Sequence, residues 1–214
     1  RLYDFRPVFR NSSAMAYAIA YCIHTLEMSA LRGWGVAFLS YVAATTGAVT
    51  ASVLSPAIVA TGLGLIGTFA SVAGNETAIR FGRKRLILIA MLASILVGAT
   101  IGFLGSMSYG LAAVLLTLYG IVIWLDSSSL TAGTAGTAEP SRRGATLAVH
   151  SMLGYAGGFV GPLLVGWVLD LSGGMSQLSW GLSFLSVAML MGLALITFWV
   201  IRPRELEGDK SKVA

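Results

Sequence analysis

The chain has 214 residues, of which 56% are hydrophobic and only 11% are charged, and its mean hydropathy is +0.82. Soluble domains carry about 25% charged residues, so this composition excludes an ordinary soluble domain and predicts a membrane protein. The net charge of +5 comes from basic residues in separate loops and tails, which disfavours a nucleic-acid-binding face, and the single cysteine excludes an internal disulfide framework.

Long charge-free stretches predict the membrane helices, because about 20 apolar residues are needed to cross a bilayer. Residues 33–75 and 86–125 contain no charge, and each is long enough for most of two helices. Pro56 and the segment TTGAVTAS divide the first stretch, and GSMSYG divides the second. Two further stretches, 144–169 and 171–201, are separated by Asp170 and SGGMSQ. The sequence therefore predicts an all-α polytopic membrane protein with six transmembrane helices, near residues 13–43, 51–74, 85–105, 109–135, 145–169 and 178–201.

The basic residues predict the orientation of these helices. If the chain crosses the membrane six times, every Lys and Arg except Arg32 falls on one side, which is the cytoplasmic side by the positive-inside rule. We expect residues 1–12 to be the end of a cytoplasmic linker, 13–201 to be the membrane domain, and 202–214 to be a polar, mobile cytoplasmic tail. The short loops favour a bacterial inner membrane.

The first predicted helix carries the clearest set of ionisable side chains. His24 and Glu27 are three residues apart and share a helix face, which Tyr17 and Tyr21 extend toward the amino terminus. Charged groups inside a membrane usually face a partner or a cavity. We expect Glu27 to hold a proton, or to pair with Arg32 or with a substrate cation, while Arg32 is expected to bind an anionic substrate group. His24 is expected to titrate near neutral pH.

A second interpretation of this helix depends on where it ends. If it continues past Gly33, then His24, Glu27 and Arg32 all lie near its middle. If it ends near Leu31, Arg32 is a residue of the far membrane edge and Glu27 lies near the interface. The main alternative to a functional role for Arg32 is a structural pair between Arg32 and Glu27.

The fourth predicted helix supplies another acidic candidate, Asp126, which precedes three serines. Asp126 is expected to relay protons or line a cavity, or else to pair with Arg142 and Arg143 or hydrogen-bond across a helix interface. His150 and Glu76 are expected near the cytoplasmic edge, solvated or paired with loop residues. The tyrosines and tryptophans at 34, 109, 124, 155, 167 and 180 are interpreted as interfacial or packing residues.

The segment GNETAIRFGRKR, residues 74–85, lies between two nearly charge-free stretches. Its run I-R-F-G-R-K-R resembles the D-R-x-G-R-R/K loop signature of the major facilitator superfamily of secondary transporters. Ile79 stands where the family has its aspartate, and Asn75 stands where it has its first glycine. The resemblance implies a gating loop made of Asn75, Glu76, Arg80, Gly82, Arg83 and Lys84.

The stretch from 139 to 170 resembles the glycine- and proline-rich helix of the same family. Glycines at this spacing let helices approach closely, and a proline inside a helix supplies a bend. The resemblance therefore implies helix packing or bending, or both, at Gly154, Gly157, Gly158, Gly161, Pro162 and Gly166.

The resemblance also implies a fold and a function. A six-helix unit with cytoplasmic ends corresponds to half of a twelve-helix transporter, and such a half contains two three-helix inverted repeats. The linker-like start and the eroded signature favour the carboxyl-terminal half, so a missing amino-terminal six-helix half is the expected partner. The expected function is secondary transport of a small organic solute, driven by protons, with no enzyme activity, metal or cofactor. The alternative is a non-transporting six-span protein that acts by helix association with a partner.

Overall fold

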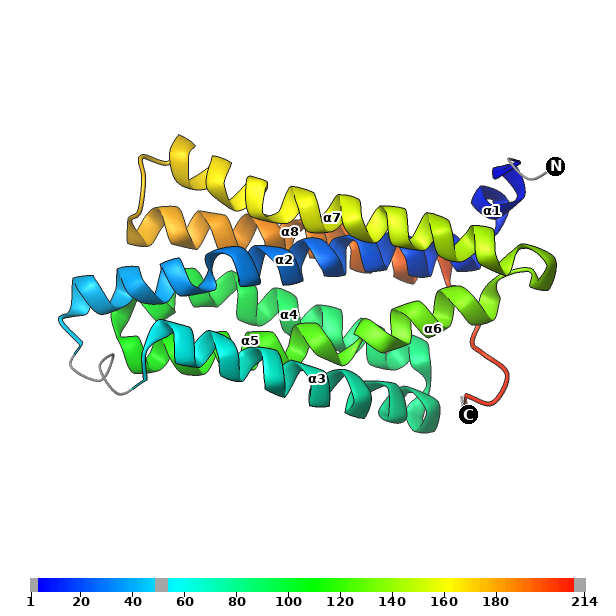
Figure 1. Ribbon diagram of the computed structural model, residues 1–214, viewed down its shortest axis with the longest axis horizontal. Helices are drawn as coiled ribbons and strands as arrows, with labels where there is room; N and C mark the ends of the chain where they lie inside the picture. The colour runs from blue at the N-terminus through cyan, green and yellow to red at the C-terminus, as the bar shows by residue number, and fades with distance from the viewer. Residues whose placement is uncertain (1–3, 49–53, 210–214) are drawn as a thin grey trace.

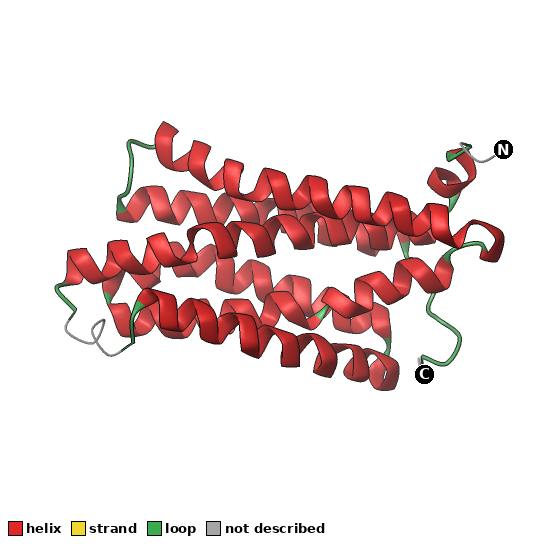
Figure 2. Cartoon of the chain, viewed as in Figure 1, coloured by secondary structure: helices red, strands yellow, loops and turns green. Residues whose placement is uncertain are grey.

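The structure is a computed structural model and describes residues 4–48 and 54–209. Every regular element in these two ranges is a helix, as Figure 2 shows, which confirms the predicted all-α class. The elements in chain order are α1 (Arg6–Arg10), α2 (Ser12–Thr46), α3 (Pro56–Phe81), α4 (Arg83–Leu104), η2 (Gly105–Met107), α5 (Tyr109–Leu125), α6 (Ser127–Thr137), η3 (Pro140–Arg142), α7 (Arg143–Leu171) and α8 (Gln177–Ile201).

The long helices lie side by side in an elongated bundle with α2 at its centre (Figure 1). α2 packs against α7 and α8 on one side and against α3, α5 and α6 on the other. The two ends of the described chain lie at the same end of the bundle. Polar contacts join segments there, because the Arg142 guanidinium donates to the Asp4 carbonyl at 3.2 Å and the Asn11 amide donates to the Thr137 carbonyl at 2.8 Å. We call this end the basic end.

Five helical segments of the described chain are long and apolar enough to cross a membrane, and they contain α3, α4, α5 with α6, α7 and α8. These five coincide with five of the six predicted spans. α2 is the longest helix, with 35 residues, but it is not among the five. α2 contains His24, Glu27 and Arg32, which lower its hydropathy. Helix length and hydropathy therefore support five of the predicted spans but not the sixth, α2.

The structure corrects the interpretation of residues 74–85 as a loop. α3 continues to Phe81, so Asn75, Glu76 and Arg80 are helical, and α4 begins at Arg83. The turn between the two helices is the single residue Gly82, whose φ of 100° is one that glycine adopts at little cost. The start of α3 is also defined locally, because Ser55 caps the helix and Pro56 occupies its first turn. The predicted start at residue 51 lies outside the described residues.

The predicted fourth helix, 109–135, is broken into α5 and α6 at Asp126. A close helix contact lies beside this break. A Cβ on Gly74 of α3 would overlap the carbonyl oxygen of Leu125, so α3 approaches the backbone of the break at a distance that only glycine permits.

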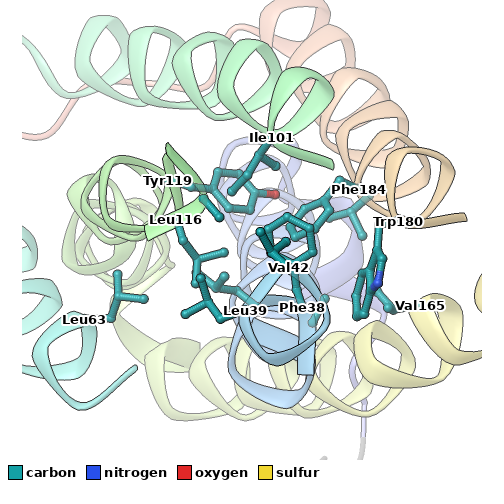
Figure 3. Close-up of a cluster of buried hydrophobic side chains, with 14 of the residues drawn as sticks. Phe38, Leu39, Val42, Leu63, Ile101, Leu116, Tyr119, Val165, Trp180 and Phe184 are labelled. Atoms are coloured by element: carbon teal, nitrogen blue, oxygen red, sulfur yellow. The ribbon is translucent and has the colours of Figure 1, made fainter. Parts of the chain in front are cut away.

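The core at the end opposite the basic end is aromatic (Figure 3). Trp180 and Phe184 of α8 both pack edge-to-face with Phe38 of α2 and are tilted relative to each other. Tyr119 of α5 packs edge-to-face with Phe184. Many large apolar side chains outside the core are exposed, among them Phe69, Leu96, Phe159 and Leu193. An exposed apolar exterior is the surface that a bilayer or a membrane partner covers.

Candidate functional site

α2 is one continuous helix from Ser12 to Thr46. At 1.5 Å per residue it is about 50 Å long, and His24, Glu27 and Arg32 lie near its middle. The interpretation in which this helix ends near Leu31 is therefore wrong. These three side chains lie far from both ends of the bundle.

Glu27 is buried, with an exposed fraction of 1%, and hydrogen-bonds to two neighbouring helices. The Tyr119 hydroxyl of α5 donates to Oε1 at 2.7 Å, and the Ser94 hydroxyl of α4 donates to Oε2 at 3.3 Å. No basic side chain among residues 4–48 and 54–209 forms an ion pair with Glu27. A small cavity of about 10 Å³, near the lower limit for one water molecule, is lined by Glu27, Tyr119 and Trp180 among other residues. Glu27 is thus a buried carboxyl group with neutral hydrogen-bond donors.

His24 and Asp126 form the second buried polar contact. Asp126 is the residue at the break between α5 and α6, and its side chain does not cap α6. Instead its Oδ1 lies 3.1 Å from Nδ1 of His24, although the angle is not that of a hydrogen bond. In the described part of the chain, Asp126 pairs with neither Arg142 nor Arg143, the alternative predicted from sequence.

His150 of α7 belongs to the same buried region, and the prediction of a solvated or loop-paired residue is wrong. Its exposed fraction is 3%, and its ring nitrogens lie 3.3 Å and 3.0 Å from the hydroxyls of Thr131 and Thr134 of α6. The ring of Tyr21 stacks on His150 with centroids 3.9 Å apart, and on His24 with centroids 5.7 Å apart. Tyr21 thereby joins the two histidines.

Two of the candidates on α2 lie outside this buried group. Tyr17 is buried nearer the basic end, where its hydroxyl donates to the Arg204 carbonyl at 3.0 Å. Arg32 is exposed, forms no ion pair with Glu27, and places its guanidinium 4.8 Å from the centre of the Trp124 ring. The predicted structural pair between Arg32 and Glu27 is therefore absent from the described chain.

The motif residues at the α3–α4 junction do not act as one unit. Glu76 and Arg80 form an exposed ion pair one helical turn apart, at 2.8 Å, so the first arginine of the motif meets the Glu76 carboxylate at an exposed position. Arg83 is buried, donates to the side chain of Asn75 at 2.9 Å, and binds Asp209 through two hydrogen bonds. The carboxylate that binds Arg83 thus comes from the carboxyl-terminal segment.

The segment after α8 packs against the basic end, where the sequence predicted a mobile tail. The backbone N–H of Lys84 donates to Glu205 at 3.2 Å, and the backbone N–H of Arg204 donates to the Ser13 hydroxyl at 3.1 Å. Leu206 lies directly against Gly136 of α6. Polar composition along the chain does not reveal these contacts, because they depend on which helix ends meet at this point.

α7 approaches α2 most closely at Gly157 and Gly161, where a Cβ would overlap the carbonyl oxygens of Cys22 and Leu26. The other candidates on α7 also face α2. A Cβ on Gly154, Gly158 or Gly166 would lie 2.5, 3.2 or 3.3 Å from side-chain atoms of Tyr21, Ser29 and Trp34, respectively. Pro162 lacks an N–H, and its carbonyl accepts a hydrogen bond of 2.9 Å from the indole of Trp34.

Two hollows lie on either side of Met28 of α2, and we call them together the open face. The first, of about 470 Å³, lies between α2 and α7, and the second, of about 120 Å³, lies between α2, α3 and α5. Tyr21 lines the first hollow and Arg32 lines the second. The described residues contain no group of three or more His, Cys, Asp or Glu side chains that would hold a metal ion.

Sequence reasoning missed three members of this region. Ser94 and Tyr119 lie in apolar helices and carry no charge, so only their contact with Glu27 distinguishes them. Trp124 was interpreted as an interfacial or packing residue, yet its ring lies beneath Arg32. A buried acid predicts that such partners exist, but not which helix supplies them.

The family model described as Major Facilitator Superfamily matches residues 12–214 of the chain. None of the curated proteins compared with the chain matches it. The match covers α2 together with the five apolar helical segments of the described residues.

Proposed function

The chain belongs to the Major Facilitator Superfamily, and on this premise we propose that it forms one six-helix half of a proton-coupled transporter for a small organic solute. The family implies membrane transport of small solutes. The observation that carries the proton coupling is Glu27, a buried carboxyl group at the middle of α2 with hydroxyl donors and no basic partner among the described residues.

In this proposal α2 is the sixth membrane-spanning helix. Its length is sufficient, and both ends of the described chain lie at the basic end, as an even number of crossings requires. The basic residues of the α3–α4 junction, the α6–α7 connection and the segment after α8 also gather there. By the positive-inside rule this end is cytoplasmic, and we propose a bacterial inner membrane as the location.

The chemistry follows from the two buried acids. A carboxyl group in a membrane interior is stable when protonated, and it is stable when charged only if donors or a cation compensate the charge. Tyr119 and Ser94 supply such donors to Glu27, and the His24 ring lies 3.1 Å from the Asp126 carboxylate. Glu27 and His24 are one helical turn apart, so a proton bound at one site changes the field at the other.

The open face is the surface at which we expect this unit to contact a partner. A helix surface with two hollows and an exposed arginine is unfavourable in contact with lipid. We propose that a second six-helix unit covers the open face, with the solute bound between the units. Six helices with cytoplasmic ends correspond to two inverted repeats, here α2 to α4 and α5 to α8.

Solute-driven proton movement tests the function directly. The full-length protein, as its gene encodes it, is reconstituted into liposomes that contain a pH-sensitive dye, and pools of small organic solutes are added outside. We expect at least one pool to move protons with wild-type protein, and Glu27→Gln to abolish this movement while retaining exchange of labelled for unlabelled solute. Glu76→Gln is the matched control, because Glu76 is exposed at the basic end.

Two outcomes would contradict the proposal. Solute uptake without proton movement in the wild type would exclude proton coupling. Exchange activity absent for every pool would instead support the alternative, in which the helices only associate with a partner.

A further inference from the structure

Arg32 is the only charged residue among the described residues that line the two hollows of the open face. It lies near the middle of α2, about 30 Å from the amino end of this helix. An arginine at this depth costs several kcal/mol unless it meets an anion, a cavity or water. Its guanidinium is exposed to the second hollow and forms no ion pair with any residue that the structure describes.

Trp124 holds the guanidinium in this position. The ring lies 4.8 Å from the Arg32 guanidinium carbon, a distance at which an arginine stacks on an aromatic face. Trp124 is itself held against α3, because a Cβ on Gly67 would lie 2.5 Å from the indole. Stacking uses the face of the guanidinium and leaves its N–H groups free to bind a planar anion.

The rest of the lining is neutral and largely apolar. Aromatic rings line the first hollow at Tyr21, Tyr155 and Phe159, and none of the acidic side chains that the structure describes lines either hollow. A cationic solute would therefore meet a like charge and no counter-ion on this face. An anion with an apolar or aromatic body finds one charge for its anionic group and rings for its body.

We propose that the open face binds a small organic anion, a carboxylate with an aromatic or apolar body, whose carboxylate pairs with Arg32 above Trp124. This inference rests on the proposed transport function and names its class of solute. Arg32 and Glu27 lie apart and have different roles: Arg32 binds the charge of the solute, and Glu27 holds the proton. An anion that moves together with a proton crosses the membrane as a net neutral pair.

Three ligands of nearly the same shape test the charge preference: benzoate, benzamide and benzamidine. Thermal melting of the full-length protein in detergent is measured with each ligand, together with 3-phenylpropionate and indole-3-acetate as larger anions. We expect at least one anion to raise the melting temperature by several degrees, with no comparable effect of the neutral or cationic analogue. Arg32→Gln is expected to weaken binding of that anion by about tenfold or more.

The matched control is Arg202→Gln. Arg202 also stacks on a tryptophan, Trp199, at 5.8 Å, but it lies at the end of α8 and lines neither hollow. This variant should bind the anions as the wild type does. Arg32→Glu should reverse the preference toward benzamidine, a gain that misfolding cannot produce.

The proposal is overturned if benzamidine stabilises the wild type more than benzoate does, if no anion stabilises it, or if Arg32→Gln binds the anions unchanged. These are binding measurements without a proton gradient. Anion binding without solute-driven proton movement would reject proton coupling but support the anion site. Proton movement driven only by cations would support proton coupling but reject the anion site.

Discussion

Asp209 accepts two hydrogen bonds from the guanidinium of Arg83, one from Nε at 2.9 Å and one from Nη2 at 3.0 Å. The two residues are 126 positions apart, and their side chains have exposed fractions of 3% for Arg83 and 4% for Asp209. This pair ties the segment after α8 to the α3–α4 junction, where the family's loop signature has its own aspartate and this chain has Ile79. The carboxylate that binds Arg83 therefore comes from a segment far along the chain and not from residue 79.

We expect Asp209→Asn to release the segment after α8 from the basic end. The substitution leaves the buried Arg83 guanidinium without a full counter-charge, and removing one partner of a buried pair costs about 3–5 kcal/mol. Hydrogen exchange of residues 203–209, followed by mass spectrometry, should become faster in this variant. Glu207→Gln, at an exposed position of the same segment, is the control and should leave the exchange unchanged.

The exposed pair Glu76–Arg80 should contribute much less. Its side chains have exposed fractions of 57% and 67%, and such pairs typically contribute about 0.2–1 kcal/mol. A double-mutant cycle with Glu76→Gln and Arg80→Gln is therefore expected to give a small coupling energy, well below that of the Arg83–Asp209 cycle. Equal coupling energies in the two cycles would show that burial does not distinguish the pairs.

Tyr119→Phe should impair solute-driven proton movement, because it removes the hydroxyl that donates to Glu27. Leaving a buried acceptor without its donor costs about 1–3 kcal/mol, so we also expect a lower melting temperature. Tyr109→Phe is the matched control on the same helix. Its hydroxyl donates to the Leu54 carbonyl at the far end of the bundle, so this variant should keep its proton movement. Equal loss of transport in both variants would argue against a specific role for Tyr119.

Two glycine substitutions should change stability in opposite directions. In Gly157→Ala the new methyl group would overlap the Cys22 carbonyl of α2, and such overpacking costs about 1–3 kcal/mol. In Gly192→Ala the methyl group meets no atom within 4 Å, and alanine stabilises a helix interior by about 0.5–1 kcal/mol relative to glycine. Melting temperatures of the two variants in detergent check the signs. A stabilised Gly157→Ala variant would mean that α2 and α7 do not pack as closely as described.

Labelling of introduced cysteines tests whether α2 crosses the membrane. In a Cys22→Ser background, Arg10→Cys and Thr46→Cys place exposed thiols near the two ends of α2. A membrane-impermeant maleimide should label residue 10 from the cytoplasmic side and residue 46 from the opposite side. Ser141→Cys in η3, just before α7, and Met175→Cys in the connection after α7 should be labelled from the same sides as residues 10 and 46, respectively. Labelling of residues 10 and 46 from the same side would exclude α2 as a span.

The hydropathy of the sequence predicts the fold class and most helix positions. Charge-free stretches predict five spanning helices that the structure contains, because a helix of about 20 apolar residues satisfies its own backbone hydrogen bonds. The polar composition of α2 left its end uncertain between Leu31 and a position beyond Gly33, and only the structure shows that it continues to Thr46. The family resemblance was also visible in the sequence, and the match over residues 12–214 confirms it.

Tertiary packing decided which side chains meet. The sequence placed Glu27 and His24 on one helix face, but Ser94 reaches Glu27 from α4, Tyr119 reaches it from α5, and Asp126 reaches His24 from the α5–α6 break. Apolar periodicity depends on neighbours along one chain segment, whereas a hydrogen-bond partner depends on the rotation and depth of the helix that packs across from it.

The break at Asp126 and the contacts of the carboxyl-terminal segment were decided in the same way. Nothing near Asp126 in the sequence is a proline, yet the helix breaks there, next to the close approach of Gly74 to the Leu125 carbonyl. Asp209 looks like part of a solvated tail until the fold brings Arg83 beside it. The sequence by itself determined the approximate positions of most helices and where charge is scarce. The tertiary structure determined which of the remaining charges are paired, buried or exposed, because pairing and burial depend on contacts between segments distant in the chain.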